Sequence, residues 1–423
     1  MSDPPQPFGP FGGFDISQML RFLQSDGPVH WEVARQVARW VALEGRSEPS
    51  VTAEDRARMG QVASAAEQRV LAETGEPAPS RPLALLGRAE WADQALQTLR
   101  PVLEKLAVSL QGELPGPGEE GDMPNPFAGL FGMGSGPGGP GGAPGSGGEG
   151  GAGGQGPMGA NPLAGMFGAL GPLLLGVQCG FVVGQLAQSL LSEHDLLLPI
   201  ADPPRPALVV PNLDAFHESW SIPVDDLCFY LAIGEAVRSR IVSRPWIRER
   251  LVRLATDYVS SFKIDPSALE AQLGSIDISD PSSFENPMLD PDALLGAMQS
   301  PEQLEVLERF QLTTAVLESY ADSVAERIGE PMIKTLSTIR EAMHRHRVER
   351  SEADRFIQRL LGLDPSRRLH DEASSFCRGV AERAGADALD RLLESESMLP
   401  TPNELEAPGL WLARIELFGE GAE

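Results

Sequence analysis

The chain has 423 residues, of which 42% are hydrophobic, so one large domain or two ordinary domains with a sizeable core are possible. The formal net charge of −26 repels phosphate backbones and anionic lipid, so we expect neither nucleic acid nor an anionic membrane surface as a partner. The three cysteines are far apart and none lies in a CxxC pair, which argues against disulfides and thiolate zinc sites and favours a cytoplasmic location.

The N-terminal part divides into two predicted regions. Residues 1–14 contain repeated proline and glycine and lack the basic start and apolar stretch of a signal peptide, so we predict a disordered N-terminus. Residues 15–114 carry apolar side chains at spacings of three and four, which predicts a helical region. Within it, Thr52 followed by Asp55 is typical of a helix start.

Residues 115–160 are dominated by glycine and proline and are predicted to be a disordered insertion, because such a segment cannot bury enough apolar area to offset backbone entropy. No strand precedes its glycines and no GK[ST] follows them, so a phosphate-binding loop is rejected. The uncharged run at 161–192 contains many glycines and several glutamines. It favours a small-residue-rich, buried helix pair over a membrane span.

The rest of the chain, residues 161–417, is predicted to be one helical domain. Two short apolar runs around a proline-rich turn, Leu196–Ile200 and Ala207–Val210, predict a β-hairpin. Helix starts follow at Ser300, Ser351 and Thr401. The fold class is therefore mostly α, a multi-helix fold with one small β-hairpin.

An unusual pair of residues lies on the predicted helix at 225–242. Gly234 and Arg238 share its core-facing side with Leu227 and Leu231. Glycine costs about 1 kcal/mol relative to alanine inside a helix, and a buried arginine needs a carboxylate partner. Packing alone would select neither residue.

The spacing of this pair matches a zinc-peptidase motif. In zincins, H-E-x-x-H places two histidines one helical turn apart on one zinc ion, and the glutamate between them activates the bound water. Here the same frame is Gly234-Glu235-Ala236-Val237-Arg238. The glutamate is in register, and both histidines are replaced.

Segments along most of the chain carry a family resemblance. They are "GPVHWEVARQVARW", "VVPNLDAF", "LVRLATDYVSSFKIDPSALEAQLGSID", "LLGAMQSPEQ", "VERSEADRFIQRLLGLD" and "LPTPNELEAPGLWLARI". With them the chain resembles the actinobacterial zincin-like metallopeptidase family, which is related to proteins labelled as associated with deazaflavin cofactor biosynthesis. The resemblance implies a zincin-like fold over 161–417, a zinc cofactor, H-E-x-x-H in the helix containing Glu235, and a later E-G-Y-x-x-H-V segment. That segment's glutamate, the implied third zinc ligand, corresponds to Glu318 here, and its tyrosine is retained as Tyr320.

The departures from the family pattern affect the metal. Gly234 offers no donor atom, and the permanently charged guanidinium of Arg238 cannot bind zinc. Glu318, even with Glu235, falls short of the three protein ligands of a catalytic zinc. We therefore predict that zinc has been lost, that Glu235 is an idle general-base equivalent, and that the chain is an inactive homologue that binds or regulates an unknown protein or peptide partner.

Two other functions stay open from sequence. One is an active metallohydrolase with shifted ligands, such as His217 with Glu235 and Glu318. The other is a helical interaction scaffold unrelated to peptidase chemistry. His194 also flanks the hairpin region and could approach the motif, although no pattern places it there.

Arg238 suggests how a lost metal could be compensated. Without zinc, Glu235 and Glu318 would face each other as like charges. We predict that Arg238 replaces the metal's charge by pairing with these glutamates and that Gly234 leaves room for its guanidinium. The alternative is that Arg238 extends to solvent and Gly234 only permits close helix packing.

Minor candidates have structural explanations. His344 and His346 are two residues apart on a predicted helix and point to different sides, so they are not expected to share a metal. The acidic loop at 277–292 lacks the regular frame of a calcium loop, and helix capping accounts for its Asp and Ser residues.

Overall fold

The computed structural model describes residues 27–48, 51–77, 81–111, 162–195, 197, 205–261, 301–348 and 367–420. The predicted N-terminal segment 1–14, the insertion at 115–160, the acidic loop at 277–292 and the caps Ser300 and Ser351 lie outside these residues. Within them the chain is mostly helical with one two-stranded sheet, which confirms the predicted fold class.

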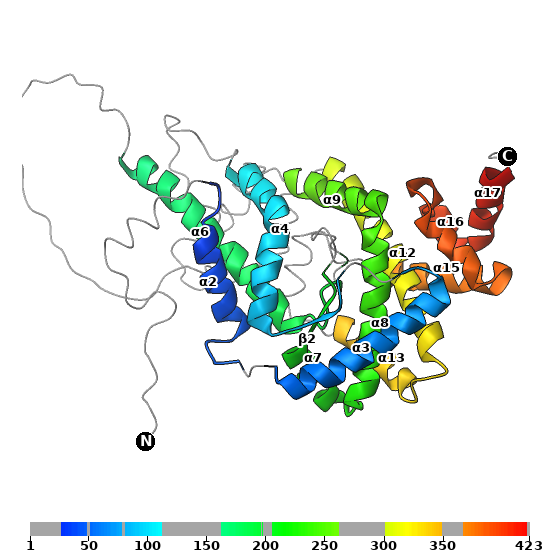
Figure 1. The fold of residues 1–423 in the computed structure, drawn as a ribbon. Coiled ribbons are helices and arrows are strands. Elements are labelled where there is room, and N and C mark those ends of the chain that lie inside the picture. The colour runs from blue at the N-terminus through cyan, green and yellow to red at the C-terminus, as the bar shows by residue number, and fades with distance from the viewer. Residues whose placement is uncertain are drawn as a thin grey trace, which may run out of the picture.

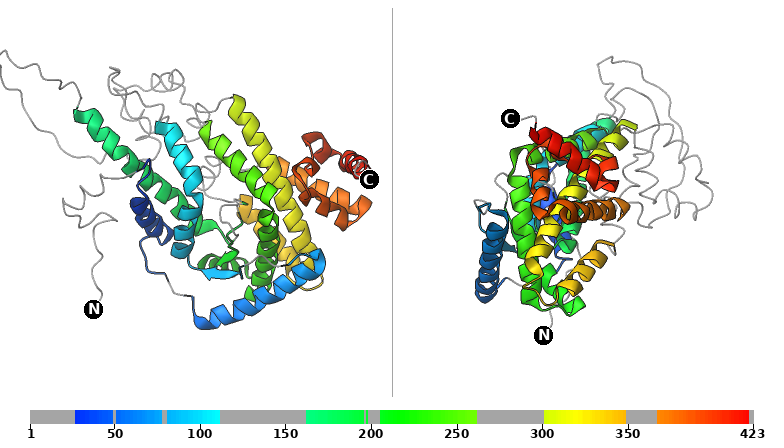
Figure 2. Two further views of the ribbon diagram at one scale, coloured as in Figure 1. Left: turned by 45° about the horizontal axis from the view of Figure 1, so that its top comes forward. Right: turned by 90° about the vertical axis from the view of Figure 1, so that its right-hand side faces the viewer.

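Helices from distant parts of the sequence surround α8. In chain order the helices are α2 (Trp31–Ala42), α3 (Ala53–Thr74), α4 (Arg88–Gln111), α6 (Pro162–Ser189), α7 (Val210–Trp220), α8 (Val224–Ser243), α9 (Pro245–Ser260), α12 (Pro301–Gly329), α13 (Leu336–Val348), α15 (Arg367–Ala384), the 3-10 helices η2 (Ala386–Leu393) and η3 (Glu396–Met398), α16 (Pro402–Glu406) and α17 (Pro408–Glu420). Figure 1 shows α8 in the middle of the molecule, with α2, α4 and α6 on one side and α15, α16 and α17 on the other. The most extensive helix contacts of α8 are with α3 and α12, and two further views show the long α12 beside it (Figure 2).

The helix starts at Thr52 and Thr401 are confirmed. The hydroxyl of Thr52 accepts a hydrogen bond of 3.1 Å from the backbone N–H of Asp55. At the start of α16, the Glu404 carboxylate accepts a bond of 2.8 Å from the Thr401 N–H, which completes a capping box. Both caps satisfy backbone groups that a helix leaves without partners, so short-range sequence patterns located these ends correctly.

The glycine-rich run at 161–192 forms one helix, α6, and its partner is α2. A Cβ on Gly176 would lie 2.5 Å from the carbonyl oxygen of His30, and one on Gly180 would collide with the carbonyl of Ala34. Glycine therefore lets the two helix backbones approach closely. In the part of the chain that the structure describes, no helix is long and apolar enough to cross a lipid bilayer.

The small sheet joins two segments that are far apart in the sequence. The strand predicted at Ala207–Val210 is present as β2 (Ala207–Val209), and it pairs in parallel with β1 (Ala84–Leu86). Most of the other predicted strand, Leu196–Ile200, lies outside the described residues, so the hairpin stays a prediction. The pairing with β1 was not predicted, because β propensity marks a strand but does not identify which distant segment will pair with it.

Helix α8 is buried on almost every side. From Leu227 to Val242, every residue except Phe229 is buried, including four polar or charged ones. They are Glu235, Arg238, Ser239 and Arg240. The predicted helix is confirmed, but it is a central core helix and not one with a single buried face. Each of its polar groups must therefore find a partner inside the protein.

Candidate functional site

Glu235 is completely buried, and both of its carboxylate oxygens are hydrogen-bonded. Oε1 accepts bonds from the His194 ring nitrogen Nδ1 at 2.7 Å and from the Ala207 backbone N–H at 3.0 Å. Oε2 accepts a bond of 3.2 Å from the backbone N–H of His194. This carboxylate thus connects three segments: α8, the turn after α6, and the start of β2.

His194 forms a buried ion pair with Glu235. Only 3% of the histidine is exposed. Burial alone would lower the pKa of His194, but the charge of Glu235 and the hydrogen bond to it outweigh burial, so the pKa is raised above its usual value. Because the Glu235 carboxylate accepts, Nδ1 of His194 is the donor, which fixes the orientation of the ring. The sequence had left the position of His194 open, and the fold places it directly against the motif glutamate.

Gly234 and Arg238 fit together as predicted. A Cβ on Gly234 would lie 2.7 Å from Nη1 of Arg238, so the guanidinium lies over the glycine in space that a side chain would fill. Only 7% of Arg238 is exposed, so it does not extend to solvent. Gly234 therefore accommodates the guanidinium.

Among the described residues, the carboxylate bound to Arg238 is Asp322 of α12. Nη2 of Arg238 donates to Oδ1 of Asp322 at 2.6 Å. The sequence had suggested Glu235 or Glu318 for this role. Asp322 lies one helical turn beyond the half-buried Glu318, so the two acids share a face of α12. The structure thus brings the motif helix and the helix of the implied third ligand together, with an arginine–aspartate pair between them.

Comparison with known proteins identifies the family. The family model for the zincin-like metallopeptidases matches residues 29–412. The chain belongs to the zincin-like metallopeptidase family. A protein from Chloroflexus aurantiacus, described as a "putative hydrolase with a novel fold", has a similar solved structure. It has 18% sequence identity and a TM-score of 0.57, over 92% of this chain and 99% of that one, which shows a shared fold. The comparison with curated proteins gives no match.

The residues at the motif do not fit the zinc ion that this family's name implies. Gly234 has no donor atom, a guanidinium lies where a ligand would be needed, and both oxygens of Glu235 are already bonded. Among the described residues, no three or more His, Cys, Asp or Glu side chains are grouped so that they could hold a metal ion. His217, Glu235 and Glu318 therefore form no such group.

His30 and His346 have structural contacts, and His217 lies near the end of α7. His346 donates from Nε2 to the Ser189 carbonyl at 3.0 Å and packs edge-on against Phe216. His30 caps α2 by accepting from a backbone N–H.

Sequence reasoning missed Asp322 and Glu193. Asp322 could have been found, since it stands four residues after Glu318 and directly before Ser323, the position to which the sequence resemblance assigns a histidine. Glu193 adjoins the buried pair, and its Oε2 is shielded from solvent without a hydrogen-bond partner. Burial raises the pKa of Glu193 to about 7. No local pattern distinguishes this glutamate from an ordinary surface acid.

Proposed function

We propose that this member of the zincin-like metallopeptidase family is non-catalytic and acts by binding a protein or peptide, with its former peptidase centre converted into part of the core. The observation that carries the proposal is the state of Glu235. Its side chain is 0% exposed, and both oxygens are held by His194 and by the Ala207 backbone. A general base must reach the proton that it removes, directly or through one water molecule. In this arrangement Glu235 reaches neither.

The charges at the motif support the same proposal. A zinc ion would have to sit beside the permanently charged guanidinium of Arg238, which repels it. Arg238 instead supplies the positive charge between α8 and α12 through its bond to Asp322. We infer that the Arg238–Asp322 pair supplies the positive charge that a zinc ion would supply, but does not provide a metal-bound water for hydrolysis.

The finer assignment within the family rests on sequence resemblance. We propose that the chain belongs to the actinobacterial branch linked to deazaflavin cofactor biosynthesis and that its H-E-x-x-H motif has degenerated at Gly234 and Arg238. A cytoplasmic location is proposed from cysteine usage alone.

Hydrolysis and metal content test the proposal. Full-length protein purified without chelators is incubated with casein and a peptide library, with and without added zinc, and its metal content is measured by elemental analysis. We expect no chelator-sensitive cleavage and far less than one metal ion per chain. The matched variants are His217→Ala and Glu318→Gln, which remove the ligands of the shifted-site alternative. Chelator-sensitive cleavage that disappears in either variant would overturn the proposal.

A further inference from the structure

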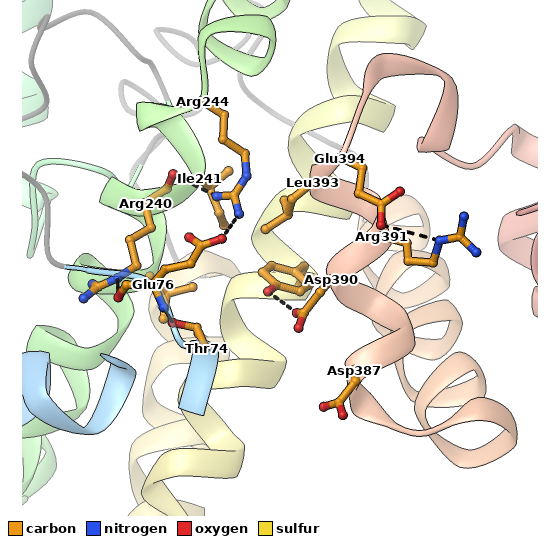
Figure 3. Close-up of a pocket in the computed structure, with 12 residues that line it drawn as sticks. Thr74, Glu76, Arg240, Ile241, Arg244, Asp387, Asp390, Arg391, Leu393 and Glu394 are labelled. Carbon is orange, nitrogen blue, oxygen red and sulfur yellow. Dashed lines mark hydrogen bonds and ion pairs between the residues drawn. The ribbon is translucent and has the colours of Figure 1, made fainter. Parts of the chain in front are cut away.

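A cavity of about 410 Å³ lies beside the C-terminal half of α8, away from the Glu235 contacts. Its walls come from the end of α3, from α8, from α12 and from η2, and Figure 3 shows the residues that line it. Volumes of 300–1,000 Å³ are usual for small-ligand sites (roughly, across known proteins). None of Gly234, Glu235 and Arg238 lines it.

The wall from α8 is cationic and contains an arginine without a carboxylate partner. Arg240 is 5% exposed, and its Nε and Nη1 donate only to the neutral carbonyls of Glu76 and Ala236, at 3.3 and 2.8 Å. Its Nη2 has no hydrogen-bond partner. The Glu76 carboxylate is taken by Arg244, one turn further along α8. Burial lowers the pKa of Arg240 more than the charges of Glu67 and Glu76 raise it, and neither carboxylate hydrogen-bonds its guanidinium. This wall therefore favours an incoming anionic group.

The opposite wall, from η2, is anionic. Asp387 is exposed and forms no hydrogen bond or ion pair within the described chain. Asp390 accepts a bond of 2.6 Å from the Tyr320 hydroxyl, and Glu394 is 3.6 Å from Arg391. Figure 3 shows Asp390 across the cavity from Glu76, Asp387 lower on the same wall, and Glu394 directed toward Arg391. Such a wall favours an ammonium group.

Apolar side chains lie between the two charged walls. Val237 and Ile241 of α8 and Leu393 of η2 line the cavity, and Figure 3 shows Ile241 and Leu393 between the basic and acidic groups. A ligand that satisfies all three surfaces carries a carboxylate, an ammonium and an aliphatic part.

We propose that this cavity binds a compact aliphatic zwitterion, a free amino acid or a dipeptide, with its carboxylate toward Arg240 and Arg244 and its ammonium toward Asp387 and Asp390. The inference goes beyond the proposed loss of catalysis, because it does not use Gly234, Glu235 or Arg238. The two proposals are independent of each other. The protein could be non-catalytic whether or not this cavity binds a ligand, and the cavity could bind a ligand whether or not the protein is an active enzyme.

Titration calorimetry on the full-length chain tests the ligand class. The probes are L-leucine and L-leucyl-L-leucine, which separate an amino acid from a dipeptide. The matched controls are N-acetyl-L-leucyl-L-leucine, without the ammonium, and L-leucyl-L-leucinamide, without the carboxylate. We expect saturable binding of at least one zwitterion and at least a tenfold loss for each control. No saturation by either zwitterion at about 10 mM, or binding of a control within threefold, would overturn the proposal.

Variants of each wall locate the site. The double variant Asp387→Asn with Asp390→Asn changes exposed residues and keeps an acceptor for the Tyr320 hydroxyl. Arg244→Gln tests the cationic wall by removing the charge of Arg244 while the guanidinium of the buried Arg240 stays in the chain. Each is expected to weaken binding at least tenfold, whereas Glu382→Gln, an exposed change on α15, leaves binding unchanged. Wild-type affinity in both wall variants would show that the zwitterion binds elsewhere and would refute the assignment.

Discussion

Replacing Glu235 with glutamine should lower the stability of this protein, which is not the usual result for a general base. In a working zincin the same change removes the catalytic group from an accessible site. Here the carboxylate accepts three hydrogen bonds inside the core, two from backbone N–H groups and one from His194. Glutamine has one acceptor oxygen, and its NH₂ group would point a donor at another donor.

The magnitude follows from these contacts. Breaking a buried ion pair by removing one charge costs about 3–5 kcal/mol. This range includes the loss of a charge-assisted hydrogen bond and the cost of a backbone N–H that faces the NH₂ group of glutamine. At roughly 2 °C per kcal/mol for a large domain, the midpoint of thermal unfolding should fall by about 6–10 °C.

Urea denaturation and thermal unfolding measure the change, with Glu318→Gln as the matched control on a half-buried acid of α12. A double-mutant cycle with His194→Gln isolates the pair, and we expect a coupling energy above about 1 kcal/mol. If Glu235→Gln lowered the free energy of unfolding by less than about 0.5 kcal/mol, the buried network would not hold Glu235 as described, and the argument for an idle base would lose its main support.

Three further predictions concern the same region. Gly234→Ala should not gain the usual stability of about 1 kcal/mol, because its Cβ would meet the Arg238 guanidinium, but it should gain that stability in an Arg238→Ala background. Urea denaturation of wild type, the two single variants and the double variant measures both effects. Equal effects of Gly234→Ala in the two backgrounds would contradict the prediction. The pKa of Glu193 is higher in the folded protein than in the unfolded chain, so the free energy of unfolding should fall as the pH rises from about 4.5 to 7. The slope is at most about 1.4 kcal/mol per pH unit. The raised pKa of His194 should continue this fall at higher pH. Glu193→Gln should flatten the lower part of that curve, measured as the urea midpoint against pH, and an unchanged curve would contradict the assignment. The pair Gly234→His with Arg238→His should take up about one zinc ion by elemental analysis and lose it on Glu318→Ala; zinc retained by that triple variant would mean that Glu318 is not the third ligand.

Features that depend on neighbouring residues could be predicted from the amino-acid sequence. The helix containing Glu235, the caps at Thr52 and Thr401, and the strand at Ala207 were all predicted, because helix and strand periods and caps act over a few residues. The space that Gly234 leaves for Arg238 was also predicted, since both lie on one helix a single turn apart.

Contacts between distant residues depend on how the helices pack and could not be predicted from the sequence. His194 and Glu235 are 41 residues apart, and Arg238 and Asp322 are 84 apart. For each contact the sequence offered several candidate acids or histidines and no means of choosing among them; for Arg238, both Glu318 and Asp322 were candidates. The parallel pairing of β2 with β1 and the two charged walls beside Arg240 have the same origin. Burial on almost every side of α8 forces its polar groups to bond within the core, and which groups lie within reach depends on how the surrounding helices pack.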